Sequence, residues 1–317
     1  MFLLRKQQLS LNLSNITEVI THNGNAHVDD FLSCCLALAL FPNLKVIKRV
    51  ASNGMENFKA TKQQLLLDVG MRYDQKQYFD HHQIPANKFT CTLNLFLTTI
   101  FPSFSKKDFN TFFPQLNTIG IADTNGVSFA YNYVLGSKNI SISSINSLTS
   151  VIEITLLNLF SENTIYETSS NAELPIIRIM KDIGLRILKS LKDKQSFYNA
   201  LRDPTSNIFK SYLIGKESIA IVLDRILSKD EIVLLDDFIL SNSLFSNTYK
   251  KFPIDFIISR SSQDKNKWSV IRKNKYINFK QLNHSLIEFK HNSGFMLVFK
   301  ANTKIQQILE ILTKIKN

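Results

Sequence analysis

The chain is poor in cysteine, histidine and tryptophan, and the shortage of cysteine already narrows the classes of site it can carry. Its 317 residues include three cysteines, six histidines and one tryptophan. Cys34 and Cys35 are adjacent within an apolar stretch, and Cys91 stands alone. An odd count without any C-x-x-C spacing argues against a disulfide framework and against a zinc site made of thiolates. We therefore expect three buried, reduced thiols.

Long apolar runs are also lacking. The longest, FLSCCLALALF at residues 31–41, is too short to cross a bilayer and predicts a buried helix instead. No membrane partner is expected, and the sequence contains no internal repeat or low-complexity tract. Residues 1–14 carry two basic residues and no acid, which loosely resembles a mitochondrial presequence without its arginine ladder. The expected location is intracellular, in cytoplasm or nucleus, with the mitochondrion as the alternative.

The chain has fewer acidic residues than basic ones. The chain has 38 Lys and Arg against 26 Asp and Glu, a net charge of +12. A basic protein suits polyanions such as nucleic acid, but an AT-biased genome, which favours Lys, Asn and Ile, gives the same balance. The 24 phenylalanines are expected to fill a core, although aromatic rings can also stack on bases. The length fits two domains.

Strands and helices alternate in the first 70 residues, which predicts an α/β fold with a parallel sheet. We expect a helix at residues 30–40, ended by Pro42, and strands at residues 17–22, 44–50 and 64–70. Ligands of such sheets bind beyond the carboxyl ends of the strands. His22 and Asp68 fall at those ends.

The rest of the chain predicts a helical region and a second α/β domain. Residues 89–160 have a helical pattern with Phe-rich faces, interrupted by a polar turn at residues 120–126. An amphipathic helix is expected at residues 173–194, with Ile176, Ile179, Ile183 and Ile187 on its repeating face. Further on, we expect strands at residues 218–224, 255–259 and 268–272 and a helix at residues 303–314. The predicted domains are residues 1–160, a helical connector at 161–217, and residues 218–317.

Histidine and aspartate gather in the segments THNGNAHVDD and FDHHQ, which hold four of the six histidines. Imidazoles and carboxylates without thiolates suit Mn²⁺, Mg²⁺, Co²⁺ or Zn²⁺. Two such ions about 3.5–4 Å apart can activate water and clamp a phosphoryl group. Taken singly, each His is more typical of surface or core, and each Asp of a cap or turn. Here they stand in three separate segments that each end a predicted strand or follow one closely, and this grouping favours a site. The candidates are His22, His27, Asp29, Asp68, Asp80, His81, His82 and Asp123.

Three segments, THNGNAHVDD, LLLDVGMRYD and YFDHHQ, resemble the Myg-type family of the DHH phosphoesterase superfamily in order and spacing. The later segments IVLDR, at residues 221–225, and HNSGFMLVF, at residues 291–299, resemble further landmarks of that family. The resemblance implies a DHH-type metal-binding domain with a parallel sheet and a helical segment. It also implies a smaller α/β domain at the C-terminus that closes over the substrate.

The resemblance implies a role for each matching residue. His22, His27 and Asp68 would hold a first metal ion. Asp29, His81 and Asp123 would hold a second one, with Asp68 bridging the two. His82 would face the phosphoryl group with support from Asp80, and these two form the catalytic set together with Asp68. The implied substrate-binding residues are His291, Ser293 and Gly294, with a simple turn at 291–294 as the alternative. Arg225 and Arg272 are further candidates because a guanidinium fits phosphate with a bidentate fork, with solvated surface charges as the alternative.

Two positions depart from the family pattern. An Asp normally precedes Asn-Gly, but Thr124 stands there and Asp123 lies one residue earlier. A shift of one residue turns a helical side chain by about 100°. Asp123 therefore either completes the second metal site after a local adjustment or leaves that site weakened. Thr92 begins a bulkier segment where the family has small residues.

The function expected from these observations is a divalent-metal-dependent phosphodiesterase, with Mn²⁺ as the foremost ion, hydrolysing by metal-bound hydroxide. By resemblance, the substrate is single-stranded RNA, trimmed from its 3′ end. One alternative is a small-molecule phosphatase acting on pyrophosphate, a cyclic dinucleotide or a short oligonucleotide. The other is an RNA-binding scaffold deficient in metal. The sequence leaves the oligomeric state open.

Overall fold

The structure of the protein is a computed structural model whose chain divides into two compact units, Met1–Lys192 and Asp193–Asn317. It describes residues 15–104, 115–126, 128–130, 152–168, 174–203, 206–215, 218–228 and 253–316, together with residues 109, 113, 133, 231, 232, 234 and 235. The presequence-like residues 1–14 lie outside the described residues. The boundary between the units falls within a long helix, α8.

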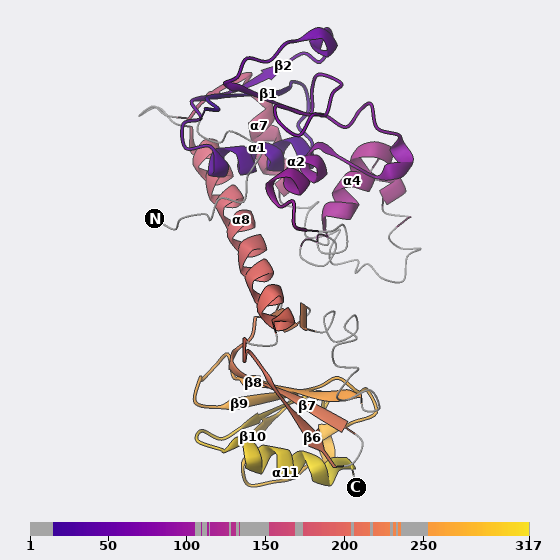
Figure 1. The fold of residues 1–317 in the computed structure, drawn as a ribbon, viewed down its shortest axis with the longest axis vertical. Helices are drawn as coiled ribbons and strands as arrows, with labels where there is room; N and C mark the ends of the chain where they lie inside the picture. Colours follow the sequence, from indigo (N-terminus) through magenta and orange to yellow (C-terminus); the bar gives the residue numbers. More distant parts are fainter. Residues whose placement is uncertain are drawn as a thin grey trace. The chain divides into compact units, whose positions relative to one another are not determined.

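The first unit contains the predicted parallel sheet (Figure 1). Its order is β4-β3-β1-β2-β5, with β1, β2, β3 and β4 parallel and β5 antiparallel at one edge. Consecutive residues of β1 and β3 are buried because both faces of such a sheet are covered. The α/β class is confirmed. The strands are β1 (Glu18–His22), β2 (Val46–Val50), β3 (Gln64–Leu67), β4 (Tyr78–Phe79) and β5 (Ile165–Glu167).

Helix α1 follows β1 and packs on both β1 and β3. Its start is fixed by Asp30, whose Oδ1 accepts hydrogen bonds from the backbone N–H of His27 at 2.7 Å and of Phe31 at 2.8 Å. The helices of this unit are α1 (Val28–Leu40), α2 (Thr92–Ile100), α4 (Gln115–Asn125), α7 (Asn158–Ser161) and the part of α8 (Pro175–Arg202) up to Lys192. Shorter turns are η1 (Met55–Asn57), η2 (Ala86–Lys88) and the π-helical η3 (Ile152–Leu157).

The polar turn expected at residues 120–126 is wrong, because α4 continues to Asn125. Thr124 donates from Oγ1 to the carbonyl oxygen of Gly120 at 2.7 Å, a bond within the helix that satisfies its hydroxyl. Gly120 serves packing rather than chain reversal: a Cβ there would lie 2.6 Å from the carbonyl oxygen of Phe89. The helix ends only at Gly126, whose φ is +86°.

The buried face of α8 differs from the predicted isoleucine stripe. Ile176 is buried as expected, but Ile179 is 42% exposed. Gly184 determines which face of α8 packs against α1. A Cβ at this position would lie 1.9 Å from the carbonyl oxygen of Cys35 on α1. Because only glycine permits that approach, α8 buries Gly184 and Leu188, while Ile183 and Ile187 are only partly buried.

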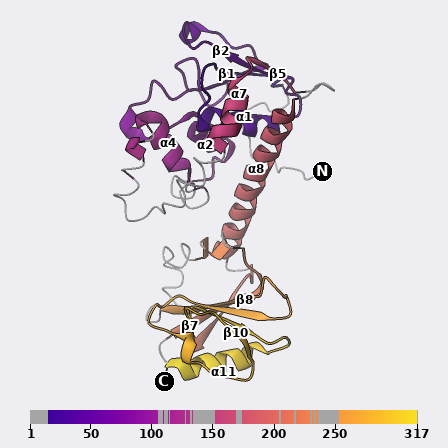
Figure 2. The ribbon, with the colours of Figure 1, turned by 180° about the vertical axis from the view of Figure 1, so that it is seen from behind.

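The second unit is a six-stranded sheet of order β10-β11-β9-β8-β7-β6, antiparallel except for the pair β7–β8. Helix α11 (Ile305–Lys316) lies against the sheet, as Figures 1 and 2 both show. Its Ile308 and Leu312 join a core with Phe256 and Phe299. The strands are β6 (Lys210–Ile214), β7 (Ser218–Ile226), β8 (Ile254–Arg260), β9 (Trp268–Arg272), β10 (Ile287–Lys290) and β11 (Met296–Phe299), with η4 (Phe279–Gln281) between β9 and β10.

The cysteines behave as the sequence predicts: Cys34, Cys35 and Cys91 are buried and form no disulfide. Burial raises the pKa of all three thiols, which suppresses the reactive thiolate form. Among the helices that the structure describes, none combines the length and the apolar composition that crossing a bilayer requires.

Candidate metal centre

Three neighbouring parallel strands deliver the histidines and aspartates to one edge of the sheet. His22 ends β1, Asp68 directly follows β3, and Asp80 directly follows β4. Because these strands run in the same direction, their carboxyl ends meet at that edge. Asp68 turns inward in the left-handed region, with φ at 60°, a conformation that Asp tolerates better than most residues.

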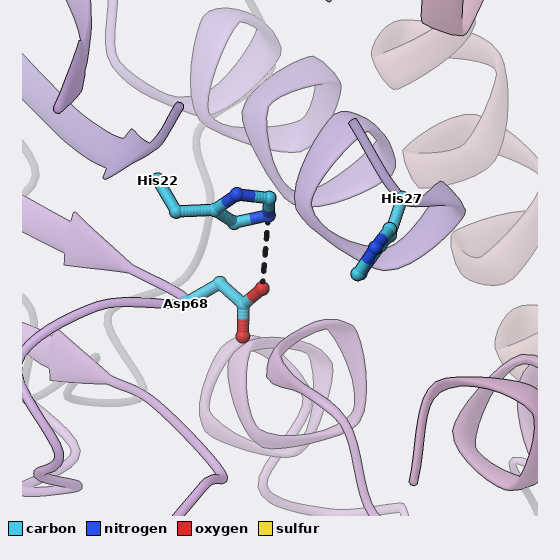
Figure 3. A group of neighbouring side chains, drawn as sticks. All are labelled: His22, His27 and Asp68. Carbon is cyan, nitrogen blue, oxygen red and sulfur yellow. Dashed lines mark ion pairs between the residues drawn. The ribbon is translucent and has the colours of Figure 1, made fainter. Parts of the chain in front are cut away.

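His22, His27 and Asp68 form the first group (Figure 3). Each offers one ligand atom, and these atoms lie within 4.8 Å of one another. The Nε2 atom of His22 is 3.4 Å from Asp68 Oδ2. Its Nδ1 atom is 2.7 Å from the carbonyl oxygen of Asn23, which can only accept, so Nδ1 carries the proton. In the neutral ring, the lone pair of Nε2 therefore faces a carboxylate, an arrangement that a cation between them would relieve.

Asp123 reaches the same centre from α4. Its Oδ2 lies 2.7 Å from His81 Nε2, and its Oδ1 lies 3.4 Å from His27 Nδ1. It forms a second candidate group with His27 and Asp29, while Asp68, His81 and His82 form a third. The shift of Asp123 by one residue therefore does not carry its side chain away from the other candidates. Asp68 belongs to two of the three groups.

The centre is suited to cations because it concentrates buried carboxylates. Asp29, Asp30 and Asp68 are at most 3% exposed, and the Asp123 side chain is 6% exposed. Several inward-facing atoms have no hydrogen-bond partner of suitable geometry: His22 Nε2, Asp29 Oδ1, Asp30 Oδ2 and Asp123 Oδ2. Buried charge left without partners is costly. The oxygen and imidazole donors fit divalent ions such as Mn²⁺ or Zn²⁺, so these groups could hold metal.

The crowding of carboxylates shifts their pKa values in opposite directions. Burial, together with the charges of Asp68 and Asp123, raises the pKa of Asp29 well above its usual range. Burial also raises the pKa of Asp30, to about 6, against the opposing effect of His22. Burial acts in the same direction on Asp123, but its interactions with His27 and His81 outweigh it and lower its pKa.

The pKa of His81 is raised to about 10. Burial would lower it, but its interactions with Asp123 and Asp68 outweigh the burial. Without metal, His81 therefore retains its proton at neutral pH, and the raised pKa of Asp29 shifts that carboxyl in the same direction. A ligand that holds a proton has to lose it to bind a cation.

Mn²⁺ binding should consequently release at least one proton at pH 7. Lowering the pH adds protons to the ligands and weakens binding, whereas raising it towards 10, the pKa of His81, strengthens binding. The expected slope is about tenfold in affinity per pH unit for each proton released. Calorimetric titrations in two buffers of different ionisation enthalpy count the protons directly. A count of zero would contradict this protonation pattern.

His82 differs from His81 in its exposure and its partner. Its side chain is 51% exposed, and its Nδ1 lies 2.6 Å from Asp80 Oδ1. Asp80 is fully engaged: Oδ1 also accepts from the backbone N–H of His82 at 2.9 Å, and Oδ2 accepts from that of Met71 at 2.7 Å. The hydrogen bond to Asp80 raises the pKa of His82. Because Nδ1 of His82 is bonded to Asp80, the other nitrogen of the His82 ring, Nε2, points away from Asp80.

Three residues that contact the candidate ligands were not predicted as part of the site from the sequence: Asp30, Arg49 and Thr92. Asp30 Oδ2 lies 3.3 Å from His22 Nε2; the doubled aspartate of VDD was its signal. Thr92, at the start of α2, donates from Oγ1 to Asp68 Oδ1 at 2.9 Å, and its backbone N–H donates to Asp29 Oδ2 at 3.3 Å. The bulkier residue at that helix start therefore orients two of the predicted ligands.

Arg49 is a buried cation, 3% exposed, that faces Asp30. Its guanidinium donates to the carbonyl oxygens of Phe160 at 2.9 Å and Gly24 at 3.1 Å, and Nη2 is 4.0 Å from Asp30 Oδ2. It also lies over the Phe160 ring, 4.7 Å from the centroid. Nothing in the strand pattern LKVIKRV distinguishes this arginine from a solvated one, so only the fold reveals it.

The predicted substrate residues His291, Ser293 and Gly294 lie in the second unit, in the turn between β10 and β11. Nδ1 of His291 is 2.9 Å from Ser293 Oγ, and the backbone N–H of Gly294 donates to the carbonyl oxygen of His291 at 2.7 Å. Gly294 has φ at +67°, and a Cβ there would lie 2.1 Å from Asn278 Oδ1. The glycine is thus required by the turn itself, whatever the turn binds.

The predicted arginines are engaged within the second unit. Arg225 pairs with Glu231 and lies 5.2 Å from the Phe197 ring centroid. Arg272 donates to the carbonyl oxygen of Lys275 at 3.0 Å and also to that of Ile277. These contacts account for much of their hydrogen-bonding capacity, and their part in substrate binding stays a prediction.

Comparison with known proteins gives two findings. A family model named MYG1_exonuc, described as "Uncharacterised protein family (UPF0160)", matches residues 18–100. The MYG1 protein YER156C of Saccharomyces cerevisiae is 35% identical over 77 residues, which are 24% of this chain and 22% of the relative. The matched region therefore spans less than a quarter of the relative's length.

These matches support the MYG1 family for the part of the chain that carries β1 to β4. The model covers the histidines and aspartates from His22 to His82 as well as Thr92, but neither Asp123 nor the second unit. The wider DHH superfamily stays a prediction from the resemblance of motifs. What the matched proteins act on does not follow from these matches.

Proposed function

We propose that the protein is a divalent-metal-dependent phosphodiesterase that degrades single-stranded RNA from its 3′ end, with Mn²⁺ as the foremost ion. One observation carries the proposal: Asp68 belongs to two groups of potential ligands, one with His22 and His27 and another with His81 and His82. A carboxylate shared in this way suits a bridge between two ions. The name of the matching family model, MYG1_exonuc, supports an exonuclease.

The net charge of +12 agrees with a polyanionic substrate, since phosphate contacts supply most sequence-independent affinity for nucleic acid. Polarity at the 3′ end rests on the family resemblance. The small-molecule phosphatase and the metal-deficient scaffold are the competing functions. The approach of Asp123 to within 2.7 Å of His81 favours a complete centre over the scaffold.

Divalent ions held by these groups would neutralise phosphoryl charge and lower the pKa of water. The residues of the chain supply the rest. Asp68 and Asp29 are oriented by Thr92 through its hydroxyl and backbone N–H. His82, held at Nδ1 by Asp80, can direct a proton on Nε2 at a phosphoryl or leaving oxygen. The raised pKa of His82 favours that protonated form near neutral pH.

The proposal is tested by incubating purified protein with 5′-labelled single-stranded RNA, with Mn²⁺ or with EDTA. A ladder that shortens from the 3′ end only with Mn²⁺ is the expected result. The same RNA labelled at its 3′ end should lose its label at once, which distinguishes an exonuclease from an endonuclease. Metal analysis of the same sample should find two ions per chain.

The competing functions give different results in this assay. Two bound ions without RNA cleavage, but with hydrolysis of pyrophosphate or a cyclic dinucleotide, would establish the small-molecule phosphatase. RNA binding without metal at micromolar Mn²⁺ and without cleavage would establish the scaffold. Either result would refute the proposed exonuclease.

His82→Ala should lose activity while keeping its metal. Its exposed ring belongs to one of the candidate groups, but Asp80 already occupies its Nδ1. We expect kcat to fall by roughly 100- to 10,000-fold, the usual contribution of a positioned proton donor, with KM and metal content little changed. Loss of both ions in this variant would instead make His82 a metal ligand.

A further inference from the structure

Three aromatic side chains near the metal centre are in mutual contact without being buried together. We call Phe89, Phe129 and Tyr133 the aromatic trio. The ring of Phe89 lies 5.3 Å from that of Tyr133 and 6.4 Å from that of Phe129, while Phe129 and Tyr133 are stacked at 6.1 Å with 20° between their planes. Phe129 is 45% exposed and Tyr133 is 43% exposed. Core phenylalanines of this unit such as Phe31 and Phe96 are fully buried, so the trio is not part of that core.

Phe89 is held in an unfavourable backbone conformation. Its φ is 48°, in the left-handed region where a bulky residue other than glycine is an outlier. Its carbonyl oxygen lies against Gly120 of α4, where any Cβ would come within 2.6 Å. Such strain costs free energy, persists only where the surroundings enforce it, and clusters at functional sites. Here it holds Phe89 in contact with the exposed pair.

Two chain segments that carry predicted metal ligands also lead to the trio. The segment that begins with His81 and His82 turns through η2 and ends at Phe89, and Asn125 donates to the carbonyl oxygen of Ala86 in that segment at 3.4 Å. Helix α4 carries Gly120, which contacts Phe89, and also Asp123, which contacts His81. The same two segments therefore position the predicted ligands and Phe89, while Phe129 and Tyr133 follow α4 in the chain.

The electrostatic surroundings of the trio favour an anionic chain. Residues 81–104 contain no acid and one residue of the Lys and Arg type, Lys88, which is exposed and adjacent to Phe89. Residues 115–133 contain one acid, Asp123, whose side chain is turned into the centre. A phosphate backbone that approaches the trio thus meets no exposed carboxylate from either segment.

We infer that the aromatic trio stacks a nucleobase of an RNA chain whose phosphodiester lies at the metal centre. The inference rests on the proposed function for the chemistry at the centre. Exposed planar rings beside a phosphodiester site are suited to bases, because every base has a π face, and such stacking tolerates any sequence. The trio gives the site a way to prefer base-bearing substrates over pyrophosphate or simple phosphoesters.

Stacking can be measured without cleavage. The probe is a single-stranded RNA with 2-aminopurine at its 3′ terminus, whose fluorescence is quenched by stacking, titrated with protein in EDTA. The wild-type protein should quench the probe. The double variant Phe129→Leu with Tyr133→Leu keeps apolar surface but removes both exposed rings, so quenching should be lost and binding should weaken by roughly 10- to 100-fold. Unchanged circular dichroism and Mn²⁺ content show that the variant is folded.

Matched variants separate stacking from other roles. Tyr133→Phe keeps the ring and should behave as wild type. Tyr276→Leu removes the 84% exposed tyrosine of the second unit and should also leave quenching unchanged. If the double leucine variant quenches as wild type does, or if the wild type does not quench at all, the inference is wrong. The second result would be expected of a trio that docks a protein segment.

A cleavage assay adds a second readout. The wild type should have a kcat/KM at least about tenfold higher for an RNA than for the same RNA with abasic 3′-terminal nucleotides, and the double leucine variant should lose that preference. Equal preference in the two proteins would overturn the inference. If Mn²⁺ causes no cleavage but quenching by the wild type remains and is lost in the double variant, the proposed phosphodiesterase fails and the stacking surface stands.

Discussion

Asp68→Asn is expected to abolish hydrolysis and to deplete the centre of metal. Asp68 belongs to two groups of potential ligands, so neutralising its carboxylate removes charge from both. We expect kcat/KM for RNA to fall by more than about 1,000-fold, equivalent to more than ~4 kcal/mol of transition-state stabilisation. Asparagine is preferred to alanine because it tolerates the left-handed conformation of Asp68, with φ at 60°.

The measurement combines the nuclease assay with metal analysis after dialysis against micromolar Mn²⁺. Two ions per chain are expected in the wild type, and fewer than one in the variant. Asp182→Asn is the matched control, because Asp182 lies on α8 in the same unit, is 59% exposed and pairs with Arg186 on the surface. Full hydrolysis by the Asp68→Asn variant would refute the two-metal proposal.

Arg49→Met is expected to destabilise the first unit strongly. Methionine retains much of the volume but cannot donate to the carbonyl oxygens of Phe160 and Gly24. It also removes the cation that faces Asp30 across 4.0 Å. Breaking a buried ionic network by removing one partner typically costs about 3–5 kcal/mol, because the remaining charge stays buried without compensation. We expect a loss of that size in the free energy of unfolding.

Hydrogen exchange in EDTA gives the local measurement, since amides of β1 to β3 report on the first unit. Trp268 is the only tryptophan and lies in the second unit, so its fluorescence during urea unfolding serves as an internal control. Arg186→Met is the matched variant, because Arg186 is 78% exposed and pairs only at the surface; it should leave exchange unchanged. Equal effects of the two substitutions would show that Arg49 contributes no more than a surface arginine.

The strands around the centre were predictable because their patterns are local. Apolar runs ending in His22 or Asp68 predict buried strands and place their polar ends at one edge of a parallel sheet. The bounds of the observed β1, β2 and β3 differ from the expected bounds by at most three residues. In the second unit, β9 matches its expected bounds and β7 and β8 extend slightly further.

The errors arose where distant backbone segments approach each other. Gly120 and Gly126 suggested a turn, but Gly120 lies inside α4 because the carbonyl group of Phe89 leaves room for nothing larger. On α8, the isoleucine spacing indicated one face, yet Gly184 against Cys35 selects another. A periodic sequence pattern cannot reveal either contact, because Gly120 and Phe89, like Gly184 and Cys35, lie far apart in the sequence.

The sequence by itself determined the α/β class, the strand ends that carry His22 and Asp68, and the imidazole and carboxylate chemistry available there, whereas the short strand β4 before Asp80 was found only in the structure. These depend on residue type and short-range periodicity. Only the tertiary structure decided which of those groups contact each other. Asp123 comes within 2.7 Å of His81, Asp30 lies beside His22 and Arg49, and Phe89 contacts an exposed aromatic pair. Such meetings depend on how α1, α2 and α4 pack against the sheet and against each other, and that packing is fixed by close contacts rather than by any local pattern.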